Sequence, residues 1–340
     1  MARVTLKPIH QQTIALTGAS SGIGLATARL ASKRGAKLLL IARNEEALLR
    51  VRDELRAEGG QAEYAVADVS DRVQLEAAVA KAQEVFGGID TWVNDAGAFV
   101  YGALDEVPIE DQRRVFDVVY WGTVYGTLVA AEALRARGGA IVNVGSVLGE
   151  FAIPYQGAYC AAKFAVKGFT EAFRRETEAK RDPISLSLIK PAAVDTLFME
   201  HARNLIGSPG TRNPPPAYDP HLVARAIVHA CEHPVRDLVV GGAGGLSLVI
   251  GNRLAPRLMD FAFANLGKPT QTSTDPGDPE RRDNLYEPRE DEAERSSLRP
   301  FTRKTSLALE AQLHPVAAAA ATLATVGALL LGAAASRRRS

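Results

Sequence analysis

Short apolar runs alternate with helical patterns along roughly the first 245 residues. The runs occupy residues 13–16, 37–41, 63–67, 91–93, 140–144, 184–189 and 237–240, and helical stretches such as 44–58 and 71–86 lie between them. Strands that are almost continuously apolar and separated by helices are typical of a parallel sheet covered on both faces. We therefore predict a doubly wound α/β fold with about seven strands, whose ligands bind outside the carboxyl ends of the strands.

The chain changes character after residue 245. Residues 244–267 are apolar and are interrupted by Pro256, which is compatible with a helix that packs on the core, contacts a second copy or lies on a membrane surface. From residue 268 to about 305 the chain is rich in Pro, Asp, Glu and Arg, as solvated linkers are. We divide the chain into a folded domain at 1–245, an apolar helical extension at 246–267, a charged, proline-rich linker at 268–310 and a hydrophobic segment with a basic tail at 311–340.

Residues 316–335 form a run of twenty uncharged residues followed by SRRRS. Such a run is long enough to span a bilayer, although its high alanine content also suits a buried or interfacial helix. The three arginines could bind anionic head groups, but one full crossing would place them opposite a cytoplasmic domain, against the positive-inside rule. We expect contact with membrane lipid through this end of the chain and leave its topology open.

Composition narrows the class of protein further. The net charge of +1 gives no reason to expect a nucleic-acid partner. The chain has only Cys160 and Cys231, hence no disulfide framework, and no apolar N-terminal leader. We expect a cytoplasmic main domain without a metal site, associated with the membrane through the C-terminus.

The stretch TGASSGIG, residues 17–24, joins the first apolar run to the first helical pattern. Glycines at such a junction let the backbone turn tightly and approach a bound group closely. The following helix directs free N–H groups and its positive dipole end at that group, which favours an anion such as a pyrophosphate. The loop therefore predicts a phosphate-binding site.

Five motifs, in this order and spacing, resemble those of the short-chain dehydrogenase/reductase family, over residues 10–245 or so. They are TGASSGIG at 17–24, ADVSD at 67–71, NDAG at 94–97, NVGS at 143–146 with YCAAK at 159–163, and KPAAVDT at 190–196. The resemblance implies a Rossmann-like fold of the single-domain type, with Asp68 on the adenine amino group and Val69 against its ring. It also implies that Val194 and Thr196 hold the nicotinamide carboxamide.

The cofactor-binding residues that the resemblance implies are Gly18, Ser20, Ser21, Gly22, Ile23, Gly24, Arg43, Asp68, Val69, Asn94, Ala96, Gly97, Tyr159, Lys163, Pro191, Val194 and Thr196.

Three residues are the predicted catalytic groups. Tyr159 and Lys163 are four apart on a helix and therefore share a face. A free phenol has a pKa near 10, and we expect the neighbouring cation to lower it so that Tyr159 acts as general acid and base. Ser146 would hydrogen-bond the substrate oxygen, while the cofactor supplies the hydride.

The end of the second apolar run indicates which cofactor is used. Enzymes for NAD place an acidic residue there for the ribose 2′-hydroxyl, whereas enzymes for NADP offer an arginine to the 2′-phosphate. This chain has Ala42 at the usual acidic position and Arg43 next to it. We predict NADP(H) in preference to NAD(H).

One departure from the family pattern bears on catalysis. Val119 stands where the family commonly has an asparagine that helps hold a water between the lysine and solvent. Valine can neither donate nor accept a hydrogen bond. Asp95 and Ala192 are milder departures. Two hypotheses follow: a working enzyme, or a catalytically weakened NADP-binding scaffold or redox sensor at the membrane.

The segment 197–224 lies where the family has its substrate lid, and it combines apolar residues with a loop rich in glycine and proline. Phe151, Ile153 and Tyr155 are expected in the same pocket. We therefore predict an oxidoreductase that transfers a hydride between NADP(H) and an apolar ketone, aldehyde, sterol-like or acyl-chain substrate, and we expect a homo-oligomer.

Overall fold

The centre of the molecule is a parallel sheet of seven strands. The computed structural model describes residues 4–206, 210–273, 282–289 and 292–323. The strands are β1 (Thr13–Thr17), β2 (Lys37–Ala42), β3 (Gln61–Val66), β4 (Thr91–Asn94), β6 (Gly139–Val144), β7 (Ile184–Pro191) and β11 (Asp237–Val240). Their order is β3-β2-β1-β4-β6-β7-β11, and every neighbouring pair is parallel. The predicted doubly wound fold is confirmed.

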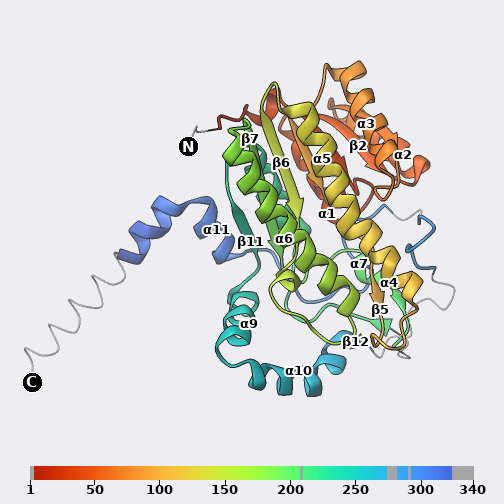
Figure 1. Ribbon diagram of the computed structural model, residues 1–340, viewed down its shortest axis with the longest axis vertical. Coiled ribbons are helices and arrows are strands. Elements are labelled where there is room, and N and C mark those ends of the chain that lie inside the picture. Colours follow the sequence, from red (N-terminus) through yellow and green to blue (C-terminus); the bar gives the residue numbers. More distant parts are fainter. Residues whose placement is uncertain (1–3, 207–209, 274–281, 290–291, 324–340) are drawn as a thin grey trace, which may run out of the picture.

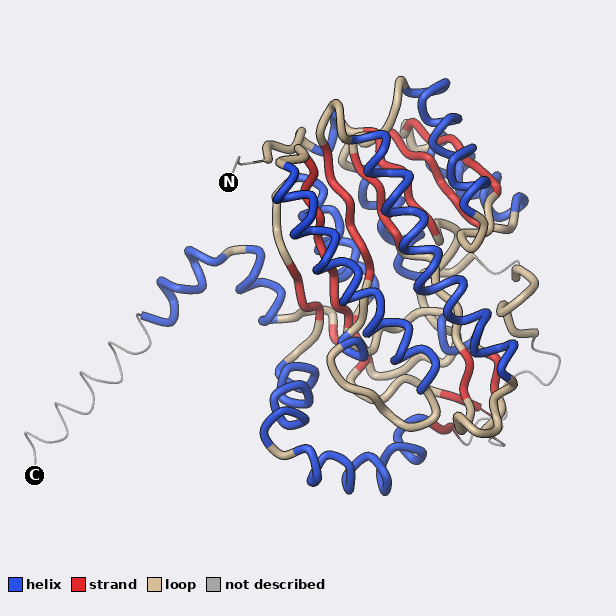
Figure 2. Tube along the Cα trace, in the orientation of Figure 1, coloured by secondary structure: helices blue, strands red, loops and turns tan. Residues whose placement is uncertain are grey.

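Helices cover both faces of this sheet (Figure 2). One face packs against α1 (Gly22–Lys33), α2 (Glu45–Ala57) and α8 (Pro220–Glu232). The other face packs against α3 (Arg72–Phe86), α5 (Gly122–Leu134) and α6 (Gly157–Lys180). The helix α4 (Ile109–Phe116) and a π-helical turn, η2 (Asp117–Trp121), precede α5. Because both faces are covered, the strands are almost entirely apolar, which is why their positions could be predicted from the sequence.

Three pairs of very short strands join loops at the carboxyl end of the sheet. They are β5 (Val100–Tyr101) with β8 (Arg203–Asn204), β9 (Gly210–Thr211) with β12 (Thr272–Ser273), and β10 (Ala217–Tyr218) with β13 (Thr302–Arg303). Two of these pairs connect the region of the predicted lid to residues beyond 270. The C-terminal part of the chain therefore packs on the predicted ligand-binding end.

The C-terminal residues form two helices and then return to the main domain. The helices α9 (Ala243–Leu254) and α10 (Pro256–Gln271) lie together at the lower end of the molecule, and α11 (Leu307–Leu313) lies beside β11 (Figure 1). The structure differs from the expected solvated linker, because Leu285 and Leu309 are fully buried in the two core clusters. Isolated apolar residues in a charged segment can anchor it, which its average composition does not reveal.

Most of the predicted membrane segment, 316–335, lies outside the described residues. Among the residues that the structure does describe, no helix combines the length and the hydropathy needed to cross a bilayer.

Candidate active site and cofactor pocket

The glycine loop has the backbone geometry that its sequence suggests. Gly18 and Gly22 have φ angles of +71° and +55°, which side-chain-bearing residues rarely adopt. A Cβ on Gly24 would lie 2.1 Å from the carbonyl oxygen of Gly18, so only glycine lets α1 start this close to the turn. The loop thus packs tightly and directs the N-terminus of α1 toward the carboxyl end of the sheet.

One cavity of about 420 Å³ extends from this loop to α10. All but two of the predicted site residues line it, namely Gly18, Ser20, Ser21, Gly22, Ile23, Arg43, Asp68, Val69, Ala96, Gly97, Ser146, Tyr159, Lys163, Pro191, Val194 and Thr196. The close-packed glycine cradle, the helix N-terminus and this elongated cavity fit a dinucleotide. Its phosphates would lie against the loop and its nicotinamide end between Val194 and Tyr159.

Gly24 and Asn94 are the two exceptions. Gly24 packs against Gly18 rather than facing the cavity. The amide of Asn94 is buried, where it accepts a hydrogen bond from Trp92 at 2.7 Å and donates one to Asn143 at 2.8 Å. Its side chain therefore joins β4 to β6, and the role of Asn94 in cofactor binding stays a prediction.

Ser146, Tyr159 and Lys163 come together from the end of β6 and from α6. The side chains of Ser146 and Tyr159 lie close enough for the serine to lower the pKa of the phenol. The Nζ atom of Lys163 donates to the carbonyl oxygen of Val144 at 2.7 Å and lies 5.5 Å from the centre of the Tyr159 ring. A serine and a tyrosine that lie together beside a buried ammonium can bind and protonate a substrate oxygen.

The protonation of these groups differs from the sequence-based prediction. Burial raises the pKa of the Tyr159 phenol, as does the neighbouring Cys160, and the nearby Ser146 side chain opposes the shift. Burial also lowers the pKa of the Lys163 ammonium to about 8, and the Asp95 carboxylate opposes that change. The expectation that Lys163 dominates and lowers the pKa of Tyr159 is therefore wrong, because desolvation is the larger effect. At neutral pH Tyr159 is a protonated donor.

Asp95 has more electrostatic influence than its sequence position suggested. It lines the cavity, and the nearby backbone N–H of Gly24, at the start of α1, lowers the pKa of its carboxyl group. Burial raises the pKa of this carboxyl group to about 8, while the charge on Lys163 opposes the rise. An acidic group thus lies between the start of α1 and Lys163.

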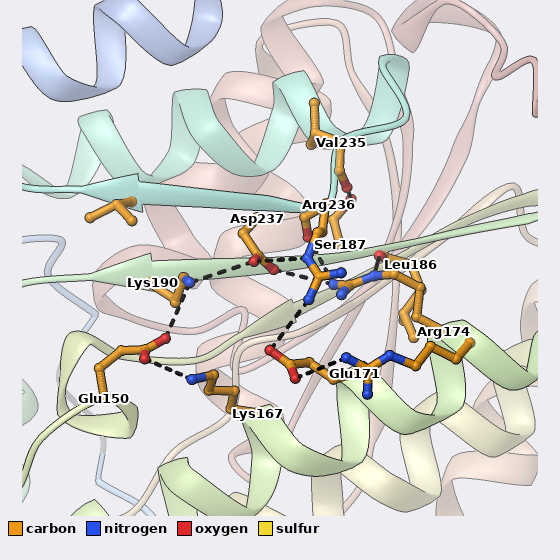
Figure 3. Close-up of polar contacts among 12 residues, drawn as sticks. Glu150, Lys167, Glu171, Arg174, Leu186, Ser187, Lys190, Val235, Arg236 and Asp237 are labelled. Carbon is orange, nitrogen blue, oxygen red and sulfur yellow. Dashed lines mark hydrogen bonds and ion pairs between the residues drawn. The ribbon is translucent and has the colours of Figure 1, made fainter.

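An ion-pair network centred on Glu150 connects the parts of the active site. Glu150 follows the short helix η3 (Val147–Gly149), for which Ser146 is the N-cap. Its carboxylate lies 2.7 Å from Nζ of Lys167, one turn beyond Lys163 on α6, and 3.3 Å from Nζ of Lys190, the residue before Pro191 (Figure 3). Glu150 therefore links the Ser146 loop to the tyrosine helix and to the carboxamide segment. Sequence reasoning missed it because its partners are distant in the chain.

At the opposite end of the cavity, Arg43 and Asp68 are bonded to the chain itself. Arg43 donates to the carbonyl oxygens of Asn284 and Tyr286, at 2.5 Å and 2.7 Å. Asp68 accepts hydrogen bonds from Arg114 and Ser70, which hold its pKa below the usual value although burial raises it. Both residues border the cavity. Their polar groups are bonded to other parts of the chain, and the sequence motifs did not reveal these partners.

Val119 is fully buried in the core cluster on the α5–α6 face. It lies within the π-helical turn η2, and its backbone carbonyl oxygen accepts a hydrogen bond from the Thr123 hydroxyl at 2.8 Å. Because its side chain is apolar, only its backbone can form hydrogen bonds. A water relay through an asparagine amide has no counterpart at this position.

The substrate end of the cavity is mostly apolar. It is lined by Phe151, Ile153, Leu197, Phe198, Met199, Leu248 and Phe263. The side chains of Gln156 and Gln271 add polar groups, and Gln156 donates to Gln271 at 2.5 Å and to the Tyr101 hydroxyl at 3.1 Å. Both glutamines went unnoticed in the sequence. Gln271 in particular lies in α10, outside the expected catalytic domain.

The chain is similar to known dehydrogenases and oxidoreductases. The family model for short chain dehydrogenase matches residues 12–205. An uncharacterized oxidoreductase, YxnA, of Bacillus subtilis is 38% identical over 339 residues, covering 99% of this chain and 94% of the relative. A 3beta-hydroxysteroid dehydrogenase of Mediterraneibacter gnavus is 35% identical over 195 residues, covering 56% of this chain and 69% of that protein.

Two solved structures resemble the main domain. An alcohol dehydrogenase from the archaeon Thermococcus sibiricus, complexed with 5-hydroxy-NADP, has 27% identity and a TM-score of 0.59, covering 67% of this chain and 95% of that one. A short chain dehydrogenase/reductase from Burkholderia phymatum, in complex with NAD, has 28% identity and a TM-score of 0.66, covering 76% and 96%. The similarity to the Bacillus relative, by contrast, spans nearly the entire chain, the C-terminal part included.

Proposed function

We propose that this chain, which belongs to the short-chain dehydrogenase/reductase family of NAD(P)-dependent oxidoreductases, interconverts apolar ketones or aldehydes and their alcohols with NADP(H). The observation that carries the proposal is the position of the Ser146 and Tyr159 side chains, with Nζ of Lys163 5.5 Å from the centre of the Tyr159 ring. They border one continuous cavity that has a dinucleotide cradle at one end and an apolar chamber at the other. This arrangement supports the proposal because a carbonyl group bound there would lie between a hydride source and a proton donor.

Each catalytic residue has a separate task in reduction. The bound cofactor supplies the hydride. Tyr159, which burial keeps protonated, donates its proton to the carbonyl oxygen, and Ser146 hydrogen-bonds the same oxygen and orients it. The ammonium of Lys163 stabilises the negative charge that remains on the phenol oxygen after the transfer. Oxidation of the alcohol uses the same groups in reverse.

The lining of the chamber supports an apolar substrate. Phe198 stacks on Phe99 at 5.1 Å and packs against Tyr159 at 5.4 Å, so an aromatic wall stands directly beside the proton donor. Phe263 of α10 stacks on Phe151 at 5.9 Å and closes the other side. A rigid, sterol-like ring system or an acyl chain would bury its surface between these walls. The similarity to a 3beta-hydroxysteroid dehydrogenase agrees with the first of these substrate classes.

The test is consumption of NADPH by the full-length protein with a panel of steroid ketones, long-chain aldehydes and 3-ketoacyl substrates. We expect turnover with at least one class. Tyr159→Phe should lose this turnover while keeping its NADPH affinity, measured by cofactor fluorescence. If NADPH binds and the whole panel fails, the scaffold hypothesis replaces the enzyme, and recovery of turnover in Val119→Asn would locate the defect.

The preference for NADP(H) rests on the pair at the end of β2. Ala42 leaves room for a 2′-phosphate without an opposing carboxylate, and Arg43 borders the cavity at the same point. Ala42→Asp should weaken NADPH binding by roughly tenfold or more, through like-charge repulsion, and weaken NADH binding much less. Equal affinity of the unmodified protein for the two cofactors would contradict the preference.

We also propose that α9 and α10 contact an anionic lipid surface. This helix pair lines the chamber through Leu248 and Phe263. Its side chains of Leu254, Leu258 and Phe261 are instead exposed at the surface. The highly exposed Arg253 and Arg257 lie next to these apolar side chains and suit anionic head groups. An apolar substrate could then pass from lipid to chamber along these helices.

Sedimentation with phosphatidylglycerol vesicles tests this contact. We expect the protein to sediment, and Leu258→Glu combined with Phe261→Glu to release it. Val73→Glu, which also charges an exposed apolar residue but on α3, is the control and should sediment normally. Undiminished sedimentation of the double variant would assign membrane binding to another part of the chain.

A further inference from the structure

The segment after α10 passes along the cofactor end of the cavity. Residues 282–289 and 292–297, here called the strap, contact residues that come directly after β1 and β2 (Figure 1). The strap belongs to the part of the chain that was expected to be a solvated linker. In the two solved structures described above, the similarity covers 67% and 76% of this chain, so each leaves part of the chain without a counterpart.

Backbone groups of the strap bind the residues that border the nucleotide site. Arg43 donates to two strap carbonyl oxygens, those of Asn284 and Tyr286. The side-chain amide of Asn44 donates to the carbonyl oxygen of Arg289 at 3.0 Å. In the phosphate loop, the N–H of Gly22 donates to the carbonyl oxygen of Ala293 at 2.9 Å. The strap therefore contacts both the ribose end and the phosphate loop.

The strap also forms a wall of the cavity. Asn284, Pro288 and Arg289 line the same space as Ser20 and Gly22. A hollow remains between the strap and the phosphate loop, so the strap arches over the nucleotide site and leaves it open inside. A dinucleotide in this cavity would have the strap on its outer side.

Ion pairs outside the cavity hold the strap in place. Glu292 bonds Arg50 of α2, with Oε1 2.6 Å from Nε. Glu294 lies 2.9 Å from Arg29 of α1 and 2.8 Å from His221 of α8, and its side chain is only 10% exposed. Neither glutamate lines the cavity. These partners belong to three different helices of the main domain.

We propose that the strap is a component of the cofactor-binding site, which encloses a bound dinucleotide from outside, fixes Arg43 at the ribose end and must detach before the cofactor leaves. This inference rests on the proposed function, because it needs a cofactor in the cavity. Its consequence is slow cofactor exchange, since release requires several ion pairs and hydrogen bonds to break together. Substrate and product at the other end of the chamber are not subject to this restriction.

Stopped-flow measurement of NADPH dissociation, by displacement with excess NADP⁺, tests the proposal. The full-length variant Glu292→Gln with Glu294→Gln loses the ion pairs but no residue of the cavity wall. We expect NADPH to dissociate from this variant roughly tenfold faster than from the unmodified protein. Glu310→Gln is the matched control, because Glu310 pairs with Arg225 at 2.7 Å and joins the C-terminal segment to α8 away from this cavity. NADPH should dissociate from this control variant at the same rate as from the unmodified protein.

Unchanged dissociation in the double variant would overturn the proposal. So would faster and tighter NADPH binding by that variant, because the strap would then compete with the cofactor instead of enclosing it. If the unmodified protein does not bind NADPH at all, that result contradicts the proposed function as well as the proposed role of the strap.

Hydrogen–deuterium exchange of the unmodified protein gives a second measurement that needs no variant. NADPH should slow exchange in peptides from the strap as well as in the phosphate loop. Slower exchange in the loop alone, or faster exchange in the strap, would contradict enclosure.

Discussion

The ammonium of Lys163 lies 5.5 Å from the centre of the Tyr159 ring and makes its hydrogen bond elsewhere, to a backbone carbonyl at the end of β6. The two residues are one helical turn apart on α6, so the lysine acts on the phenol through its charge. That charge persists only while the lysine keeps its proton. The electrostatics of the pair therefore determine how the proposed reaction responds to pH.

We expect NADPH-dependent reduction to decline as the pH rises through about 8. Tyr159 remains protonated over this range because burial raises its pKa, so Lys163, whose pKa burial lowers to about 8, loses its proton before the phenol does. Asp95 raises the pKa of that lysine by its negative charge. Asp95→Asn should therefore move the alkaline limb to lower pH, by up to roughly one unit.

The pH dependence of kcat/KM for the two proteins measures this shift. Asp53→Asn is a suitable control, because Asp53 is an exposed carboxylate on α2, and it should leave the limb in place. An alkaline limb that stays unchanged in Asp95→Asn, or moves to higher pH, would show that Asp95 does not act on the lysine.

Glu150→Gln should lower kcat more than it lowers NADPH affinity. The glutamate holds the loop after Ser146 against both α6 and β7, and a misplaced hydroxyl reduces the rate of proton transfer without removing the phosphate loop. We expect kcat to fall roughly tenfold or more and Glu150→Asp to recover part of the loss. Steady-state kinetics together with a fluorescence titration of NADPH separate the two effects.

Glu171→Gln is the matched control for Glu150. Glu171 pairs with Arg236 at 3.4 Å in the same region of α6 and β11 (Figure 3). It is linked to Glu150 indirectly, through Arg236, Asp237 and Lys190, so its replacement leaves the pairs of Glu150 with Lys167 and Lys190 in place. Loss of kcat in both variants to the same extent would indicate a general effect of removing charge from this region, and would refute a specific positioning role.

The sequence was sufficient for the sheet because each strand is buried on both faces. Continuous apolar runs such as Lys37–Ala42 leave little alternative to a central parallel strand, and their ends locate the ligand site. The meeting of Ser146, Tyr159 and Lys163 in one cavity could also be predicted, since Tyr159 and Lys163 lie in one short motif and Ser146 precedes them at a fixed spacing.

What the sequence could not show depends on contacts between distant residues. The sign of the pKa shift at Tyr159 follows from how deeply α6 is buried, which no local pattern reports. Glu150 becomes important only where its loop meets Lys167 and Lys190. The charged segment after residue 268 looked like a linker by composition, yet a few anchoring contacts, such as that of Leu285, attach it to the domain.

Leu309→Ala should lower the free energy of unfolding by about 2–4 kcal/mol, because it leaves a cavity where α11 packs into the core. Leu309 is 0% exposed and belongs to the cluster that covers the α1–α8 face. Leu307, two residues earlier, is 85% exposed, and Leu307→Ala is expected to change stability by less than about 0.5 kcal/mol. Urea unfolding of both variants makes the comparison. Equal stability would mean that α11 is not part of the cooperative fold.

Gly24→Ala should disrupt the phosphate loop, whereas Gly168→Ala should be tolerated. The new methyl group at position 24 would lie 2.1 Å from the carbonyl oxygen of Gly18 and 2.7 Å from its carbonyl carbon. Because both atoms belong to the backbone, α1 would have to move away from the turn, at a cost of about 1–3 kcal/mol. The displaced helix N-terminus would also bind a pyrophosphate less well, so we expect NADPH affinity to fall by roughly tenfold or more.

Gly168 provides the contrast within a regular helix. It lies in α6, and a Cβ there would meet no atom within 4 Å, so alanine should stabilise the helix by up to about 1 kcal/mol. Fluorescence titration with NADPH and urea unfolding of both variants give the two readouts. Normal cofactor affinity in Gly24→Ala would show that the loop can relax around a side chain, and that its close packing is not what orients α1 toward the cofactor.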